Sequence, residues 1–449
     1  MQHGQGFDID RTQRRLGPLW LAPGITPQNV LALYFVGMMS IVFITGIGLL
    51  QPYLLTEHLR LPSGEQGNFT ANLIVMVEIV AILIVAPAGI LSDRIGRRVI
   101  YTGAFLTVAV GAIVLPLASS EIAFVIFRLI LGIGTVTCTV MLASIIADYP
   151  QNPCRGTLIS SNGVITGIGV ALLSALVLAQ LPGFYVGLGA GPTAAGTFTF
   201  WTLAAAAVVA AGFAFFGLSR KAPHTERHRP SFAELMPTGL AEVRNSPRLS
   251  LACLAYFVSR GDLQVFVYFF SLWLYAVAET QGMPSDVTSG AVGRWFGLSQ
   301  LSMVLFTPVM GILCDRIDRV TALAVGMAVG ALGFLALGTI EDPLNSPWMY
   351  LVAILGGAGE ACVIVSGPAL VGQEAPARLR GSVIGVVSLC GAVGVLIHSK
   401  VSGVLFDGWD IQAPFLYMAI LNALVAAVAV AVRMRVGARA KPPTPAAAE

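Results

Sequence analysis

The sequence predicts an all-α membrane protein: twelve transmembrane helices in two six-helix bundles that are related by pseudo-twofold symmetry. Three observations carry this prediction. Apolar runs long enough to cross a bilayer recur along the whole chain, the basic residues gather in alternate loops, and the two halves of the chain share motifs at a nearly constant offset.

The composition excludes a water-soluble protein. The 449 residues are 56% hydrophobic and 11% charged, with a mean hydropathy of +0.81, which leaves too little polar material to cover a soluble core. A membrane-spanning helix needs about 20 apolar residues, and runs such as IVMVEIVAILIVAPAGIL lack the alternation of a transmembrane β-strand. Helices are therefore expected at 29–51, 68–91, 98–118, 121–147, 156–180, 197–218, 249–277, 289–314, 320–340, 347–372, 380–405 and 412–434.

The basic residues predict the orientation. With the N-terminus in the cytoplasm, 21 of the 26 Lys and Arg residues lie on the cytoplasmic side, Arg60 and Arg294 lie outside, and three fall within spans. This asymmetry follows the positive-inside rule and places both termini in the cytoplasm. The first 27 residues are polar or interrupted by Pro and Gly, so no cleavable signal peptide is expected. The Ala- and Gly-rich composition indicates a bacterial inner membrane.

The two halves of the chain repeat one another. GILSDRIGRR (Gly89–Arg98) matches GILCDRIDR (Gly311–Arg319) at an offset of 222, and CRGTLISSNGV (154–164) matches LRGSVIGVVSL (379–389) at an offset of 225. Halves in the same orientation form a parallel repeat, which is common in transporters and places the substrate site between the halves. The predicted division is an N-terminal segment 1–28, a first bundle 29–218, a linker 219–248, a second bundle 249–434 and a tail 435–449.

Over about 29–434 the sequence resembles the major facilitator superfamily of secondary transporters. The family's loop motif Gly-x-Leu-x-Asp-Arg-x-Gly-Arg-Arg is present after the second span as Gly89, Leu91, Asp93, Arg94, Gly96, Arg97 and Arg98. A second copy keeps Gly311, Leu313, Asp315, Arg316 and Arg319 but has Asp318 in place of the glycine. The family's fourth-span motif appears as RLILGIG, with Arg128, Gly132 and Gly134. The antiporter signature of the fifth span, a Gly-Pro pair, is absent, which lowers the case for antiport.

The resemblance implies a conformational latch at the cytoplasmic side. Asp93 would accept hydrogen bonds from the N-terminus of the eleventh helix, in the other bundle, and Arg97 would pair with Asp93 and with Asp148. Glycine would allow the two helices to approach closely. The predicted latch residues are Gly89, Asp93, Arg94, Gly96, Arg97, Arg98, Asp148, Gly311, Asp315, Arg316 and Arg319. Because Asp318 replaces a packing glycine, the second copy is expected to be the weaker latch.

Polar residues inside the spans are the candidates for the substrate and coupling cavity. A charge near the bilayer centre costs roughly 2.5–3.5 kcal/mol, so it normally faces the protein interior or a water cavity. The candidates are Glu78, Arg128, Arg260, Asp262, Gln264, Glu360, His398 and Lys400.

Several of these residues have more than one reading. Glu78 is either a proton carrier or a fixed partner of Arg128. Arg260 and Asp262 are two residues apart and do not share a helix face, so each is expected to pair with another helix.

For the other candidates the structural reading is at least as strong. Glu360 is equally compatible with a structural ion pair and with a functional role, and His398 fits a packing residue better than a relay. Lys400 lies near a span end and can extend to the interface. The aromatic residues of the seventh span suit a substrate with both an apolar body and a charged group. The alternative, a lipid-facing aromatic belt, explains Trp273 and Tyr275 better than it explains Phe266 or Tyr268.

The sequence therefore predicts a secondary active transporter rather than an enzyme. It contains no His-Glu-x-x-His pattern, no Cys/His cluster with metal-ligand spacing and no phosphate-binding loop for ATP. No metal, cofactor or nucleic acid is expected; the energy source would be the transmembrane proton gradient, and the chain is expected to be a monomer in the lipid bilayer.

The leading hypothesis is proton-coupled symport of a small organic solute that is anionic or zwitterionic, because three buried cations lie in the spans. The first alternative is a proton-coupled exporter of amphipathic drugs or metabolites. A uniporter or sodium-coupled carrier is the second.

Overall fold

The computed structural model describes residues 12–220, 232–376 and 378–437, and within them all twelve predicted spans are helices of membrane-crossing length. The first six spans are α1 (Pro27–Glu57), α2 (Ser63–Ile95), α3 (Arg97–Val114) with η1 (Leu115–Leu117), α4 (Glu121–Asp148), the continuous run α5 (Arg155–Gly169), η3 (Val170–Val177), η4 (Leu178–Gln180) and α6 (Leu181–Gly187), and α7 (Pro192–Gly217). The last six are α9 (Pro247–Gln264) with η5 (Val265–Phe269) and α10 (Phe270–Thr280), α11 (Ser285–Arg316), α12 (Arg319–Leu337), α13 (Met349–Glu374), α14 (Arg380–Gly408) and α15 (Ala413–Val436).

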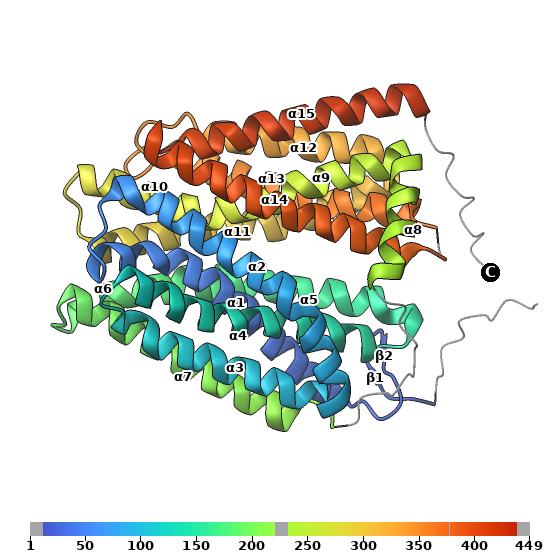
Figure 1. The fold of residues 1–449 in the computed structure, drawn as a ribbon, viewed down its shortest axis with the longest axis horizontal. Coiled ribbons are helices and arrows are strands. Elements are labelled where there is room, and N and C mark those ends of the chain that lie inside the picture. The colour runs from blue at the N-terminus through green and yellow to red at the C-terminus, as the bar shows by residue number, and fades with distance from the viewer. Residues whose placement is uncertain (1–11, 221–231, 377, 438–449) are drawn as a thin grey trace, which may run out of the picture.

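The helices form two six-helix bundles, as predicted. In Figure 1 the first bundle (blue to green) lies below the second (yellow to red), with α2 crossing between them. We call the end of the molecule that carries Arg94, Arg97, Arg98, Arg316 and Arg319 the basic end, and the other the opposite end. Helices α2 and α11 both run from the opposite end to the basic end, as parallel repeats require.

Some helices extend past their predicted limits. Pro52 ended the first predicted span at residue 51, yet α1 continues to Glu57 with Pro52 inside it. In hydrocarbon every free backbone N–H and C=O costs several kcal/mol, so a helix continues past a proline when its neighbours cover the loss. The helix starts have ordinary causes: Thr26 and Asn29 form a reciprocal capping box at α1.

The linker and the N-terminal segment add structure at the basic end. The short strands β1 (Arg15–Leu16) and β2 (Leu19–Trp20) pair as a hairpin, and helix α8 (Phe232–Asn245) lies within the predicted linker. Gly239 of α8 approaches the Ser382 carbonyl of α14 so closely that a side chain at 239 would collide with it. The linker is thus partly a helix packed on the second bundle, while residues 221–231 and 438–449, in the predicted linker and tail, lie outside the described residues.

The two bundles touch along the half of their helices nearest the opposite end. Asp407 of α14 accepts hydrogen bonds from the Gly67 and Asn68 amides of α2, at 2.9 and 2.6 Å. On the other side of the seam, Ser289 of α11 donates to the Ala179 carbonyl at 2.6 Å, and Gly293 packs against Ala175. These contacts close the opposite end.

Toward the basic end the same helices are apart. Gly89 on α2, Gly385 on α14, Gly163 on α5 and Gly311 on α11 each face open space, with no atom within 4 Å of where a Cβ would stand. Small residues favour close helix contacts in membranes, so these glycines mark faces that have no partner in this arrangement. The protein is therefore open at the basic end and closed at the opposite end.

His58, directly after α1 at the opposite end, should make stability depend on pH. Its Nδ1 lies 2.9 Å from the Pro116 carbonyl, and burial lowers the pKa of His58 below its ordinary value, although the carbonyl partly opposes this. A histidine that is held neutral in the fold takes up a proton on unfolding. Its contribution to stability is therefore complete above about pH 6.5 and is lost as the pH falls through that value. When the pH is lowered from about 7.5 to about 5.5, we expect the melting temperature of His58→Asn to fall less than that of the parent. An equal loss in the variant would refute this role.

Candidate functional site

A hydrogen-bonded network joins the two bundles at Arg128. This arginine of α4 is 4% exposed, and it donates to the Tyr268 hydroxyl of η5 at 3.0 Å and to Gln51 Oε1 of α1 at 3.5 Å. Gln51 in turn donates to the Thr70 hydroxyl of α2 at 3.0 Å. Within the described residues Arg128 has no carboxylate partner; Glu78, which was predicted as either its partner or a proton carrier, is not among its contacts. The seam is thus bridged by a buried cation among neutral acceptors.

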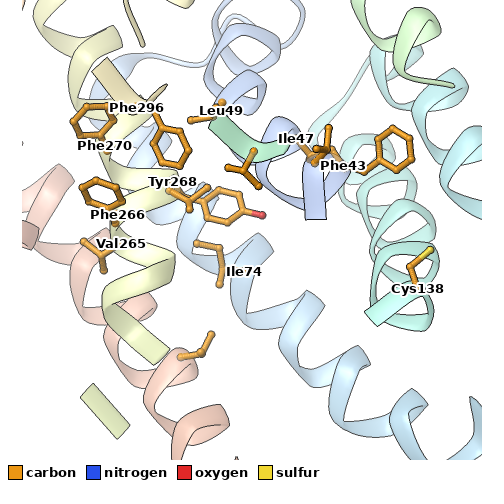
Figure 2. Packing of buried hydrophobic residues seen from close by; sticks show 14 of the residues in the cluster. Phe43, Ile47, Leu49, Ile74, Cys138, Val265, Phe266, Tyr268, Phe270 and Phe296 are labelled. Atoms are coloured by element: carbon orange, nitrogen blue, oxygen red, sulfur yellow. The ribbon is translucent and has the colours of Figure 1, made fainter. Parts of the chain in front are cut away.

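A local change of helix type places Tyr268 at this point. The seventh span passes from α-helix to the π-helical turn η5 between Gln264 and Phe270. A π-turn inserts a residue into the helical repeat and is frequent at functional sites. Figure 2 shows Tyr268 between the phenylalanines of its own bundle and Ile47 and Leu49 of α1. Gln264 is half-buried at the start of the same turn.

The aromatic residues of the seventh span face the protein interior. Trp273 is fully buried and Tyr275 is 6% exposed, so the expectation of a lipid-facing belt is wrong for both. Trp273 packs edge-on against Phe415 of α15, and Phe266 contacts Phe270 and Phe296. A span that is buried on nearly all sides has no lipid face to carry a belt.

Glu78 and Arg260 belong to different bundles and lie close enough for their charges to interact. The charge of Arg260, on α9, acts on the carboxylate of Glu78, on α2. Glu78 is half-buried and Arg260 is exposed, although both lie well inside their spans. Two opposite charges from different bundles are therefore present within the membrane depth.

Asp262 and Glu360 meet inside the second bundle. Asp262 of α9 is 4% exposed, and its Oδ1 accepts from Asn422 Nδ2 of α15 at 2.8 Å. Glu360 of α13 accepts from Gln300 Nε2 of α11 at 3.2 Å. Both carboxyl groups line one small cavity, and their charges act on each other. The predicted candidates thus divide into a seam group and a group within the second bundle.

The two candidates on α14 have structural contacts. His398 is 1% exposed, its Nδ1 lies 2.7 Å from the Tyr417 hydroxyl, and its ring packs against Phe257 and Gly261. Lys400 is exposed and donates to Asn72 Oδ1 of α2 at 2.8 Å. His398 therefore joins helices within the second bundle, whereas Lys400 adds to the closed seam.

The first copy of the loop motif forms ion pairs within the first bundle. Arg97 pairs with Asp148 and lies 3.4 Å from Asp93, as the resemblance implied. Asp93 is exposed, and its contact with Arg97 is within the first bundle. Gly96 has a φ of 104°, a conformation that favours glycine, and Arg98 stacks on Phe215 at 4.3 Å. Among the described residues, Asp93 is thus paired within its own bundle and has no recorded contact with the other one.

The second copy uses its aspartate. Asp318 does not disturb packing as the sequence suggested: its Oδ1 accepts from the Val320 and Thr321 amides and so caps α12. It also lies 3.7 Å from Arg248 and 3.5 Å from Arg433, on α9 and α15. Arg319 donates to the Ala369 carbonyl at 2.8 Å, whereas Asp315 and Arg316 are exposed. Asp318 therefore ties three helices of the second bundle together.

Sequence reasoning missed Asp407. It lies at the opposite end of α14 and accepts from two backbone amides of α2 and from Asn68 Nδ2 at 2.9 Å. The arrangement mirrors the predicted latch, in which Asp93 of α2 meets α14 at the basic end. An aspartate near the end of an apolar span was the available signal, but its partner backbone could not be read from the sequence.

Removing the Asp407 carboxylate should weaken the closed opposite end. A hydrogen bond to a charged acceptor contributes about 1.5–3 kcal/mol, so Asp407→Ala is expected to raise the fraction open at the opposite end at least tenfold. Maleimide labelling of a cysteine at Thr70, which is buried at this seam, measures that fraction. Asp410→Ala, three residues further on and exposed, is the control. Equal labelling in Asp407→Ala and the parent would rule out this role.

Comparison with known proteins places this geometry in a family. The sequence matches the Major Facilitator Superfamily over residues 33–293 and 261–449. It is 29% identical to the magnetosome protein MamH of Paramagnetospirillum magneticum over 89% of this chain and 91% of that protein. It also matches MamZ of the same organism, of whose length it spans 57%.

More distant relatives and solved structures agree on the architecture. The arabinose-proton symporter of Bacillus subtilis is 24% identical over 76% of this chain and 78% of its own length, and the multi-drug resistance efflux pump PmrA of Streptococcus pneumoniae is 24% identical over 39% of the chain and 42% of its own. The crystal structure of a mutant of the nucleoside transporter NupG has the same fold, with a TM-score of 0.72, 17% identity, and coverage of 90% of this chain and 99% of that one. The chain belongs to the Major Facilitator Superfamily of transporters.

Proposed function

We propose that this protein moves a small organic solute, anionic or zwitterionic, across the bacterial inner membrane by alternating access and proton-coupled symport. The observation that carries the proposal is the seam: it is closed at the opposite end by Asp407 and bridged by Arg128, and it is open at the basic end. In this proposal the basic end faces the cytoplasm.

The seam supports alternating access because its contacts can be exchanged. The closing bonds join backbone and polar side chains of helices from different bundles. Two rigid bundles that rock about a central site are the common mechanism of such repeats. The glycines that face open space at the basic end would become the contact surfaces of the alternate state.

The charges of Glu78 and Arg260 support a charged solute. Arg260 is exposed inside the membrane depth with Glu78 near it, so the two provide one positive and one negative group to a solute. A zwitterion would satisfy both groups, and an anion would need Glu78 to be protonated. A buried charge without a partner is costly. The opposite charges of Glu78 and Arg260 therefore also lower the free-energy cost of each other when no solute is bound.

Proton coupling rests on the carboxyl groups inside the spans. Glu78, Asp262 and Glu360 lie within the membrane depth, where a carboxyl group can change its protonation during the cycle. The relative that is named as an arabinose-proton symporter is consistent with symport.

Export of amphipathic compounds is the second candidate. The relative named as a multi-drug efflux pump and the aromatic seventh span favour it. These aromatic side chains are packed against one another, however, so only Tyr268 meets the other bundle through a polar group. This arrangement favours symport over export of bulky apolar compounds.

Uptake into proteoliposomes with an imposed pH gradient tests the proposal. Solutes that raise the melting temperature in a metabolite screen would be the substrates, and protein-free liposomes the control. Accumulation that follows an inward proton gradient and collapses with a protonophore is expected. Accumulation that ignores the gradient would exclude proton coupling, and solute loss driven by the same gradient would favour the exporter.

A further inference from the structure

We propose that Asp262 and Glu360 hold one shared proton in the small cavity of the second bundle that both residues line, and that this proton is the one that couples to transport. The inference rests on the proposed proton-coupled function. It places the coupling ion away from the seam and away from the Glu78–Arg260 pair.

The geometry shows an acid group that lacks a donor. Asp262 Oδ1 has its bond from Asn422, but Oδ2 is buried and has no hydrogen-bond partner among the described residues. A buried polar atom without a partner costs about 1–3 kcal/mol. Both Asp262 and Glu360 line the same cavity, which has room for about one water molecule. A proton on either acid would give Oδ2 a partner, directly or through that water.

The charges around the cavity do not neutralise two carboxylates. Neither Asp262 nor Glu360 has an arginine or lysine within ion-pair distance in the part of the chain that the structure describes. Gln300 and Asn422 supply one neutral hydrogen bond each. On the packed helices, His398 of α14 lies against Gly261 and bonds to Tyr417 of α15, and Arg260 lies where its charge acts on Glu78. Two like charges in an apolar site cannot both ionise readily, so one proton is retained.

The cavity favours a proton over a metal ion. Its other lining residues are apolar or glycine, including Phe266, Phe334 and Val363. A hard metal cation needs several oxygen ligands, and the described residues contain no group of three side chains suited to a metal. Protonation forms one O–H bond, changes the pair from two negative charges to one, and involves no oxidation or reduction.

The position of Asp262 provides a route to the seam. It lies three residues before the π-helical turn η5, whose Phe266 lines the same cavity and whose Tyr268 bonds to Arg128 of the other bundle. A change of charge at Asp262 acts on the start of this turn. Loss of the proton would therefore change the contact between Tyr268 and Arg128 as well as the charge in the cavity.

The test measures the proton without any solute. In purified protein, the infrared C=O band of a protonated carboxyl group is followed against pH in the parent, Asp262→Asn and Glu360→Gln, both of which keep shape and hydrogen-bonding groups. The parent should keep one such band at neutral pH. In each variant the band should vanish at a pH at least one unit lower than in the parent, because the negative charge of the second carboxyl group is gone. Asp342→Asn, in the loop between α12 and α13 and away from this cavity, is the control and should leave the band unchanged.

Further outcomes decide the two parts separately. A band that titrates identically in the parent and both variants would overturn the shared proton, even if uptake proves to be proton-driven. A band that shifts while both variants still accumulate solute against its gradient would overturn the coupling role. If uptake by the parent ignores the proton gradient, the proposed symport fails, and the infrared result alone still decides whether the two acids share a proton. Melting curves of both variants confirm folding.

Discussion

Arg128→Met is expected to lower transport at least tenfold while the protein stays folded. Methionine fills most of the volume but leaves the Tyr268 hydroxyl and the Gln51 carbonyl without their donor, at about 1–3 kcal/mol each. Loss of the charge removes a desolvation cost, so the net effect on stability is expected to be small. The lost hydrogen bonds destabilise the state of the transport cycle in which the two bundles meet at Arg128.

The measurement pairs proteoliposome uptake with thermal unfolding. Arg294→Met on α11 is the matched control, because the same change removes an exposed arginine. Arg128→Lys keeps the charge but cannot donate from a planar fork to both partners, so an intermediate rate is expected. Uptake by Arg128→Met at the rate of the parent would contradict a role for the bridge.

Gly293→Val is expected to open the opposite end and to abolish transport. A Cβ at this position of α11 would lie well under 3 Å from the Ala175 carbonyl and the Ala179 side chain, which belong to the other bundle. A backbone carbonyl in a packed helix cannot yield as a flexible side chain can, so the bundles must separate there. The contact lies between the two bundles rather than within either of them.

Labelling of a cysteine at Ser289, which is 1% exposed beside the same seam, reports the opening. We expect maleimide to react at least tenfold faster in Gly293→Val than in the parent. Gly103→Val, at an exposed glycine of α3 with no atom within 4 Å of its Cβ position, should leave the rate unchanged. An unchanged rate in Gly293→Val would show that this contact does not hold the end closed.

The architecture could be predicted because hydropathy and charge act locally. Each span is an apolar run, and the repeat of Gly89–Arg98 at Gly311–Arg319 gave the doubled unit. Helix α8 was missed because its polar stretch gives no membrane signal, and its position depends on contact with α14. The end of α1 was misplaced because Pro52 stops an isolated helix but not a packed one.

The pairings within the site could be predicted only in part. The pairing of Arg97 with Asp148 followed from the family motif. Arg128, in contrast, bonds to neutral groups, and nothing in the sequence indicates such pairings. Tyr268 reaches the seam through the π-turn, which shifts helical register in a way that regular periodicity does not describe. The role of Asp318 was misjudged because a capping aspartate satisfies the turn that glycine serves in the first copy.

The central claim is that the two ends of the seam open in alternation. Electron-spin distance measurements on a Cys390→Ser background test it, with one label pair at Glu65 and Asp410 across the opposite end and another at Ile95 and Arg378 across the basic end; all four positions are exposed. The other five cysteines are buried. Introducing Gly293→Val should lengthen the first distance and shorten the second. Two distances that lengthen together, or a basic-end distance that does not respond, would contradict alternating access in this protein.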